Sequence, residues 1–82
     1  MPWYDFLWSY EPDGNVEHIA DHGIAPNEVE CVVRNPLAVR ASRSTGRPVA
    51  LGRTSEGRLL LVVYERIDDV TIYPVTAYEI EE

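Results

Sequence analysis

The chain has 82 residues and a formal net charge of -7 at pH 7, a length that makes one small domain burying about 60–65% of its unfolded surface. Its longest apolar run, at residues 59–64, is too short to cross a bilayer, and its acidic, aromatic start lacks the features of a signal peptide. The single cysteine, Cys31, excludes an internal disulfide and a cysteine cluster for a metal. We therefore expect one soluble, cytoplasmic domain over residues 1–82, with no cofactor and no contact with membranes, stabilised as a homo-oligomer or in a complex with another protein.

The charges are segregated along the chain. Residues 34–66 hold all seven arginines against two glutamates, a net of +5, whereas the segments on either side carry acids alone and the chain has no lysine. Arginine offers a planar fork of donors that fits phosphate or carboxylate. The middle segment therefore predicts an anion-binding surface, with an ordinary solvated strand surface as the alternative. The overall negative charge opposes general nucleic-acid binding.

The first predicted element is a strand at residues 4–10. Aromatic side chains alternate there with other residues, which is typical of a strand with one aromatic face. Such a face could stack the bases of single-stranded RNA, but packing into a small core is the commoner use. We expect this face to be part of the core.

Two short helices are expected next. The first follows a turn at residues 11–14 and ends at His22, because Gly23 supplies a left-handed stop. The second begins with Pro26 at its first helical position and ends at residues 35–36, where another proline follows. Their apolar stripes are Val16, Ile19 and Ala20 in the first helix and Val29, Val32 and Val33 in the second.

The rest of the chain reads as four antiparallel strands. The strand at residues 58–66 is apolar on both faces, which predicts a central position. In the last strand, Pro74 cannot donate a ladder hydrogen bond, which predicts an edge or a bulge. The expected fold is α+β, with an N-terminal strand and two short helices on a mostly antiparallel sheet of four or five strands. The helices cover one face of this sheet, and the other face stays partly open. The four expected strands lie at residues 37–43, 47–53, 58–66 and 70–80.

The arginine-rich strands are candidates for anion binding. Alternation places Arg47 and Arg53 on one side of their strand. Across the following loop, Arg58 could converge with Arg53 on one anion. The opposite side of the strand at residues 47–53 has only small residues and is expected to leave room for a ligand: Pro48, Ala50 and Gly52.

Two further side chains are candidates for proton transfer. A metal-independent ribonuclease needs a cation at the scissile phosphate, a base for the 2′-hydroxyl and an acid for the departing 5′-oxygen. His22 can move protons at neutral pH, and Tyr78 could donate a proton or position a phosphate. The alternatives are a dipole contact at the helix end for His22 and ordinary packing for Tyr78. His18 stands one helical turn before His22, but without a clear third ligand we expect no metal site.

Short motifs in a definite order run through most of the chain: Trp8, Asn15, His22-Gly23-Ile24, Glu28-Val29, Asn35-Pro36, Gly46-Arg47, Gly52, Gly57-Arg58 with Leu60 and Val63, and Thr76-Ala77. Over roughly residues 6 to 78 this set resembles the BrnT-like toxin family of type II toxin-antitoxin systems. The resemblance implies a RelE-like fold, a ribonuclease that arrests translation, and an antitoxin with a DNA-binding domain. His22, Arg47 and Arg58 match the family pattern, whereas the arginine expected at Tyr78 is missing.

We therefore expect the toxin component of a type II toxin-antitoxin system, a metal-independent endoribonuclease whose partners are a cognate antitoxin protein and an RNA substrate. The alternative is a non-catalytic protein-interaction module, or a decayed toxin that keeps the fold, whose arginine face binds an acidic or helical segment of a partner. For the enzyme, the expected catalytic residues are His22, Arg47, Arg58 and Tyr78, and the expected RNA- or phosphate-binding residues are Arg40, Arg43 and Arg53.

Overall fold

The computed structural model describes residues 4–81. These residues form one five-stranded sheet with the strand order β1-β5-β4-β3-β2. β1 runs parallel to β5, and every other neighbouring pair is antiparallel. The α+β arrangement expected from the sequence is therefore confirmed. Along the chain the elements are β1 (Asp5–Phe6), α1 (Asn15–Ala20), α2 (Pro26–Arg34), β2 (Ala38–Ala41), β3 (Pro48–Arg53), β4 (Leu59–Arg66) and β5 (Thr71–Glu79).

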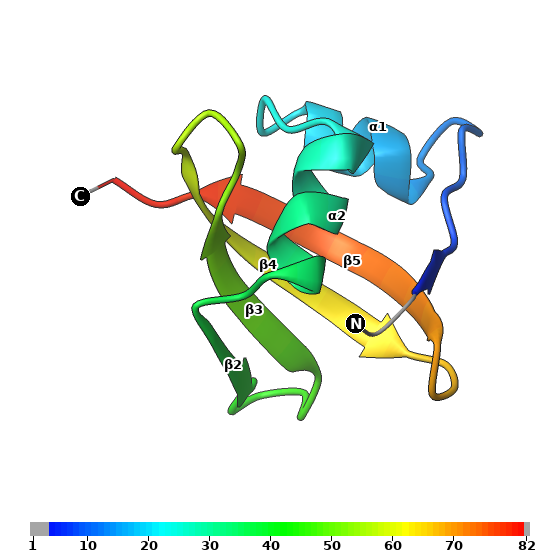
Figure 1. The fold of residues 1–82 in the computed structure, drawn as a ribbon. Coiled ribbons are helices and arrows are strands. Elements are labelled where there is room, and N and C mark those ends of the chain that lie inside the picture. Colours follow the sequence, from blue (N-terminus) through cyan, green and yellow to red (C-terminus); the bar gives the residue numbers. More distant parts are fainter. Residues whose placement is uncertain (1–3, 82) are drawn as a thin grey trace.

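Both helices lie on one face of the sheet (Figure 1), with α2 over β3 and β4 and α1 over β5. No helix of residues 4–81 covers the opposite face, as expected. Within the same residues no helix is both long enough and apolar enough to span a membrane. The core lies between the helices and the sheet, and its fully buried side chains include Ile19, Val29, Val32, Leu60, Val62 and Ile72.

The second helix agrees with the sequence pattern. Pro26 is its first residue, and the predicted stripe of Val29, Val32 and Val33 is buried. Glu28 stands in the first turn, and its Oε1 accepts a hydrogen bond from the backbone N–H of Ala25 at 3.0 Å. This contact closes the helix start, because the first N–H groups of a helix have no partner within it.

The first helix is shorter than predicted and faces the sheet differently. It ends at Ala20 rather than at His22, although Gly23 has the expected positive φ of 75°. Ile19 is buried as predicted, but Ala20 is exposed, and the second buried residue is the polar Asn15. Asn15 occupies a core position because its side chain bonds three backbone groups of neighbouring segments.

The N-terminal strand is much shorter than predicted. Of residues 4–10, only Asp5–Phe6 pairs with β5, and Tyr10 is 77% exposed rather than buried. The Asn15 side chain accepts from the N–H of Ser9 and donates to the carbonyl of Leu7. It thereby uses backbone groups that a longer strand would pair with its neighbour. Tyr4, Phe6 and Trp8 do pack against the core, as expected.

Two predictions about the sheet are confirmed. β4 lies third of the five strands, and its residues are buried or half-buried on both faces up to Tyr64. Opposite Pro74, the pairing register between β4 and β5 shifts between Val63 and Tyr64. Pro74 also lies beyond Thr71 and Ile72, the two residues that β1 pairs, so its missing N–H costs no ladder hydrogen bond.

The small side of β3 leaves room for helix α2 and not for a ligand, so that expectation is wrong. Ala50 is fully buried in the core. A Cβ on Gly52 would lie 3.2 Å from Cγ1 of Val32 and 3.4 Å from the carbonyl oxygen of Asn35. Helix and strand approach this closely because Gly52 has no side chain.

The Gly52→Ala variant is expected to destabilise the fold by about 1 kcal/mol, the lower end of the cost of overpacking. In a Val32→Ala background the cost should fall by about 0.5 kcal/mol or more, because the nearest clashing methyl is gone. Urea denaturation of the two single variants and the double variant measures this coupling. Strictly additive effects would show that the helix does not limit the space at Gly52.

Candidate functional site

Three of the four predicted catalytic side chains come together at one end of the sheet. His22 follows α1, Arg58 precedes β4, and Tyr78 lies near the end of β5. The ring centroids of His22 and Tyr78 are 5.9 Å apart. Arg58 donates to the carbonyl of Gly23, next to His22, at 3.2 Å and to the carboxylate of Glu79, next to Tyr78, at 3.0 Å. We call His22, Arg58, Tyr78 and Glu79 the end cluster.

The guanidinium of Arg58 is held by three acceptors. Its Nη1 binds Oε2 of Glu28 at 2.7 Å, while its Nη2 binds Glu79 and the carbonyl of Gly23. The hydrogen bond to Glu79 raises the pKa of Arg58 above its usual value, and the charge of Glu28 adds to this effect. Arg58 therefore stays protonated. Its contacts tie the loop between α1 and α2, and the start of α2, to the end of β5.

Sequence reasoning missed both carboxylate partners of Arg58. Glu28 precedes Arg58 by 30 residues and Glu79 follows it by 21. The sequence marks Glu28 as a first-turn acid of a helix, but it gives no sign that Glu79 faces an arginine. Pairing of Leu60 with Glu79 across β4 and β5 is what brings this carboxylate to Arg58.

A shallow hollow of about 480 Å³ lies beside the end cluster. Arg58 is the only cationic residue in its lining among the residues that the structure describes, and three glutamates face it. The hollow is therefore negatively charged, which opposes a phosphate but supplies carboxylates that can accept a proton. Its lining is Glu56, Gly57, Arg58, Leu59, Glu79, Ile80 and Glu81.

The fourth predicted catalytic residue, Arg47, lies far from this cluster. It stands just before β3, whereas Arg53 at the other end of β3 pairs with Leu59 beside Arg58. Arg47 and Arg53 are six positions apart along an extended chain, which corresponds to about 20 Å. The structure therefore does not bring Arg47 to Arg58.

Arg53 and Arg58 do not converge, contrary to the expectation from the sequence. Arg58 contacts Glu28 on the helix side of the sheet. Arg53 lies on the other side of β3 from the buried Gly52. Its Nη1 donates to the carbonyl of Gly57, in its own hairpin loop, at 2.9 Å. The two guanidinium groups leave the hairpin on opposite faces.

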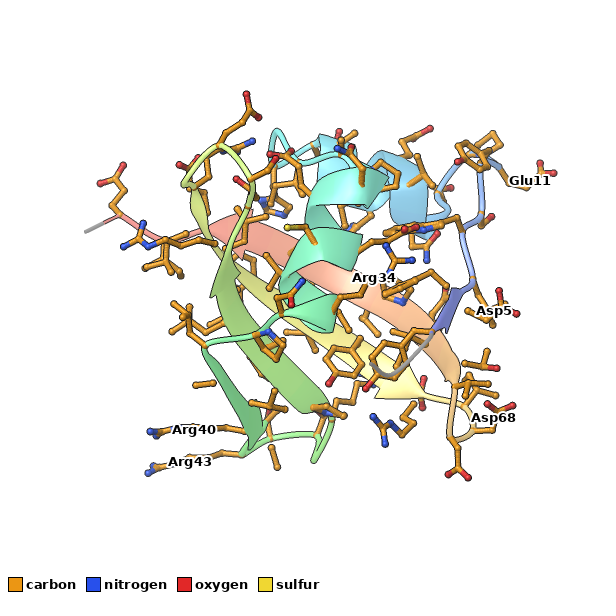
Figure 2. All side chains as sticks on the ribbon, in the orientation of Figure 1. Asp5, Glu11, Arg34, Arg40, Arg43 and Asp68 are labelled. Carbon is orange, nitrogen blue, oxygen red and sulfur yellow. The ribbon has the colours of Figure 1, made fainter. Side chains whose placement is uncertain are left out.

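The remaining candidates for RNA binding lie at another corner of the molecule. Arg40 is in β2, and Arg43 is in the turn that follows it. Figure 2 shows both side chains projecting in the same direction from this corner, while Asp5, Glu11 and Asp68 lie along the opposite side of the molecule. Arg40 and Arg43 are therefore separated in space from these acids, whereas Arg34 and Arg58 form ion pairs with glutamates of the flanking segments.

The other histidine, His18, lies beside His22, and their ring centroids are 5.9 Å apart. Across residues 4–81 no group of three or more His, Cys, Asp or Glu side chains is arranged to hold a metal ion. Cys31 is half-buried, and its Sγ lies 3.8 Å from the carbonyl oxygen of Arg53. None of these contacts adds a ligand site to the end cluster.

Comparisons with protein-family models, with curated proteins and with solved structures find no match for this chain. Its function is therefore inferred from the geometry of residues 4–81 and from the ordered motifs of its sequence. Two features bear on that inference. The first is the end cluster, and the second is the open face of the sheet.

Proposed function

We propose that the chain is the toxin component of a type II toxin-antitoxin system, which cleaves RNA in the cytoplasm without a metal ion and is silenced by a cognate antitoxin protein. The observation that supports this proposal is the convergence of His22, Arg58, Tyr78 and Glu79 from three separate parts of the chain. These side chains provide a carboxylate base, an imidazole acid and a cation, which are the groups that this cleavage requires.

The proposed reaction is an internal transfer of the phosphoryl group. The carboxylate of Glu79 takes the proton of the 2′-hydroxyl, and the 2′-oxygen attacks the neighbouring phosphorus. The bond from phosphorus to the 5′-oxygen then breaks, and protonated His22 gives its proton to that oxygen. Arg58 stabilises the charge that develops on the phosphoryl oxygens, and Tyr78 donates a hydrogen bond to them. The products are a 2′,3′-cyclic phosphate and a 5′-hydroxyl.

The second candidate is a protein-interaction module that keeps the fold without cleaving RNA. One observation favours it directly, because Arg58 already binds two carboxylates and a carbonyl group. A phosphate would have to displace one of them in a hollow that also exposes Glu56 and Glu81. A net charge of -7 also leaves little affinity from counterion release.

Removing the proton donor is expected to separate the two candidates. His22→Gln should lower the rate of RNA cleavage about a hundredfold or more, the usual contribution of a general acid, and Tyr78→Phe should lower it to a smaller extent. Tyr73→Phe is the matched control, since Tyr73 is exposed on the same strand and outside the end cluster. Cleavage is measured on total bacterial RNA with purified protein, and growth is followed after induced expression.

Arrested growth and cleaved RNA with the wild type and Tyr73→Phe, both lost with His22→Gln, would support the toxin. Thermal melting of each variant checks that the loss does not come from unfolding. Intact RNA and normal growth with the wild type would reject the toxin proposal and leave the interaction module.

A further inference from the structure

The face of the sheet that points away from the helices is largely aliphatic. On β3 and β4, half-buried side chains alternate with core residues, and cross-strand pairing sets Leu51 opposite Leu61 and Val49 opposite Val63. No helix of residues 4–81 lies over them. Aliphatic side chains gathered on an uncovered sheet face are typical of a surface that another chain covers.

A hollow of about 290 Å³ lies within this face. Four of its five lining residues are aliphatic, and no aromatic ring lines it. Base recognition in single-stranded RNA relies on aromatic rings and arginine planes for stacking, so this lining favours apolar side chains of a protein over RNA. The lining residues are Ala38 and Arg40 from β2, Val49 and Leu51 from β3, and Leu61 from β4.

Cationic side chains border the hollow on the β2 side. Arg40 lines it directly, and Arg43 projects from the same corner in Figure 2. Arg47 precedes β3, beside the same turn. Among the described residues no acidic side chain forms an ion pair with any of these three arginines. In a chain with 14 acids, this corner is left with cationic charge that carboxylates from outside can neutralise.

We propose that this surface, the aliphatic hollow together with Arg40 and Arg43, binds a segment of a partner protein in which apolar side chains stand next to carboxylates. The apolar side chains fill the hollow, and the carboxylates pair with the arginines. A second copy of this chain fits poorly, because the same face of the copy offers no carboxylate from the lining of the hollow to pair with the arginines. The inference does not depend on cleavage of RNA by the end cluster, since no residue of that cluster lines the hollow, although Tyr78 pairs with Leu61 across β4 and β5.

Peptides of known composition test the proposal. The probes are one dodecapeptide that alternates leucine with glutamate, one that alternates leucine with lysine, and a single-stranded oligoribonucleotide. Each is titrated into isotope-labelled protein while the methyl resonances of Val49, Leu51 and Leu61 are followed by NMR. We expect saturable shifts with the glutamate peptide alone, and a weaker affinity in 0.5 M salt, at roughly a 4–5 Å Debye length.

Charge-reversal variants of the arginines at the hollow test the predicted ion pairs. Arg40→Glu/Arg43→Glu should weaken binding of the glutamate peptide at least tenfold, because attraction becomes repulsion, while leaving the fold intact. Arg66→Glu is the control, since Arg66 is exposed at the far end of β4 near Tyr4. Equal binding of both peptides, shifts away from the hollow, or shifts with the oligoribonucleotide alone would overturn the proposal. The same methyl shifts on raising the protein concentration without peptide would also overturn the proposal, because they would identify a second copy as the occupant.

Discussion

The Asn15→Ala variant is expected to lose about 3–4 kcal/mol of unfolding free energy, because it leaves three backbone groups without their partner and each such group costs about 1–3 kcal/mol when buried. Asn15 is 4% exposed. Its Oδ1 accepts from the N–H of Ser9 at 2.7 Å, and its Nδ2 donates to the carbonyls of Leu7 and Pro74 at 2.9 and 3.0 Å. One side chain thus joins the N-terminal segment, α1 and β5. A domain of this size has about 4–12 kcal/mol of stability in total.

Urea denaturation measures this effect, with Asn27→Ala as the control. Asn27 is also helical, but it is exposed and lies in α2, so its loss should change the stability by less than about 0.5 kcal/mol. Asn15→Asp keeps the acceptor for Ser9 and removes both donated bonds, so it should be destabilised as well. A loss below about 1 kcal/mol for Asn15→Ala would show that water replaces these contacts.

The Arg58→Gln variant is expected to lower RNA cleavage about a thousandfold, the upper range for removing one charge-stabilising donor. Arg58 is the only cation that lines the hollow among the described residues, so nothing nearby replaces it. Its removal also leaves Glu28 and Glu79 without their cation. Arg58→Lys should recover little, because an ammonium group lacks the planar fork of donors with which arginine binds a phosphate bidentately.

Two further variants separate chemistry from structure in this prediction. Arg66→Gln removes an arginine at the far end of β4, outside the end cluster, and should cleave at the wild-type rate. Glu28→Gln weakens the structural contact of Arg58 but leaves Glu79 in place. It should keep at least a tenth of the activity if Arg58 acts on the substrate. A loss as large as that of Arg58→Gln would mean that Arg58 only holds the fold together.

Local sequence signals predicted α2 and the central strand well. Pro26 fixes the first turn of α2, and the spacing of Val29, Val32 and Val33 sets its buried stripe. The continuous apolar run of β4 predicted burial on both faces of the strand, and the structure shows it. These signals work because they act over a few residues, at the period of a single helix or strand.

The N-terminal part and the small side of β3 show where local signals fail. Alternation over residues 4–10 predicted a long strand, but Asn15 takes the backbone groups of Leu7 and Ser9. Small residues on β3 suggested space for a ligand, but α2 fills that space against Gly52. Both outcomes depend on partners that the local pattern does not contain.

The sequence by itself determined the types and order of the elements, the single uncovered face of the sheet and the segregation of charge, because apolar period, proline, glycine and composition are local properties. Only the tertiary structure decided that His22 lies against Tyr78, that Glu28 and Glu79 hold Arg58, and that Arg47 stands at the opposite end of β3. The contacts of Arg58 join residues 21 to 35 positions apart. They follow from strand register and from helix docking on the sheet, which are set by packing of the whole core.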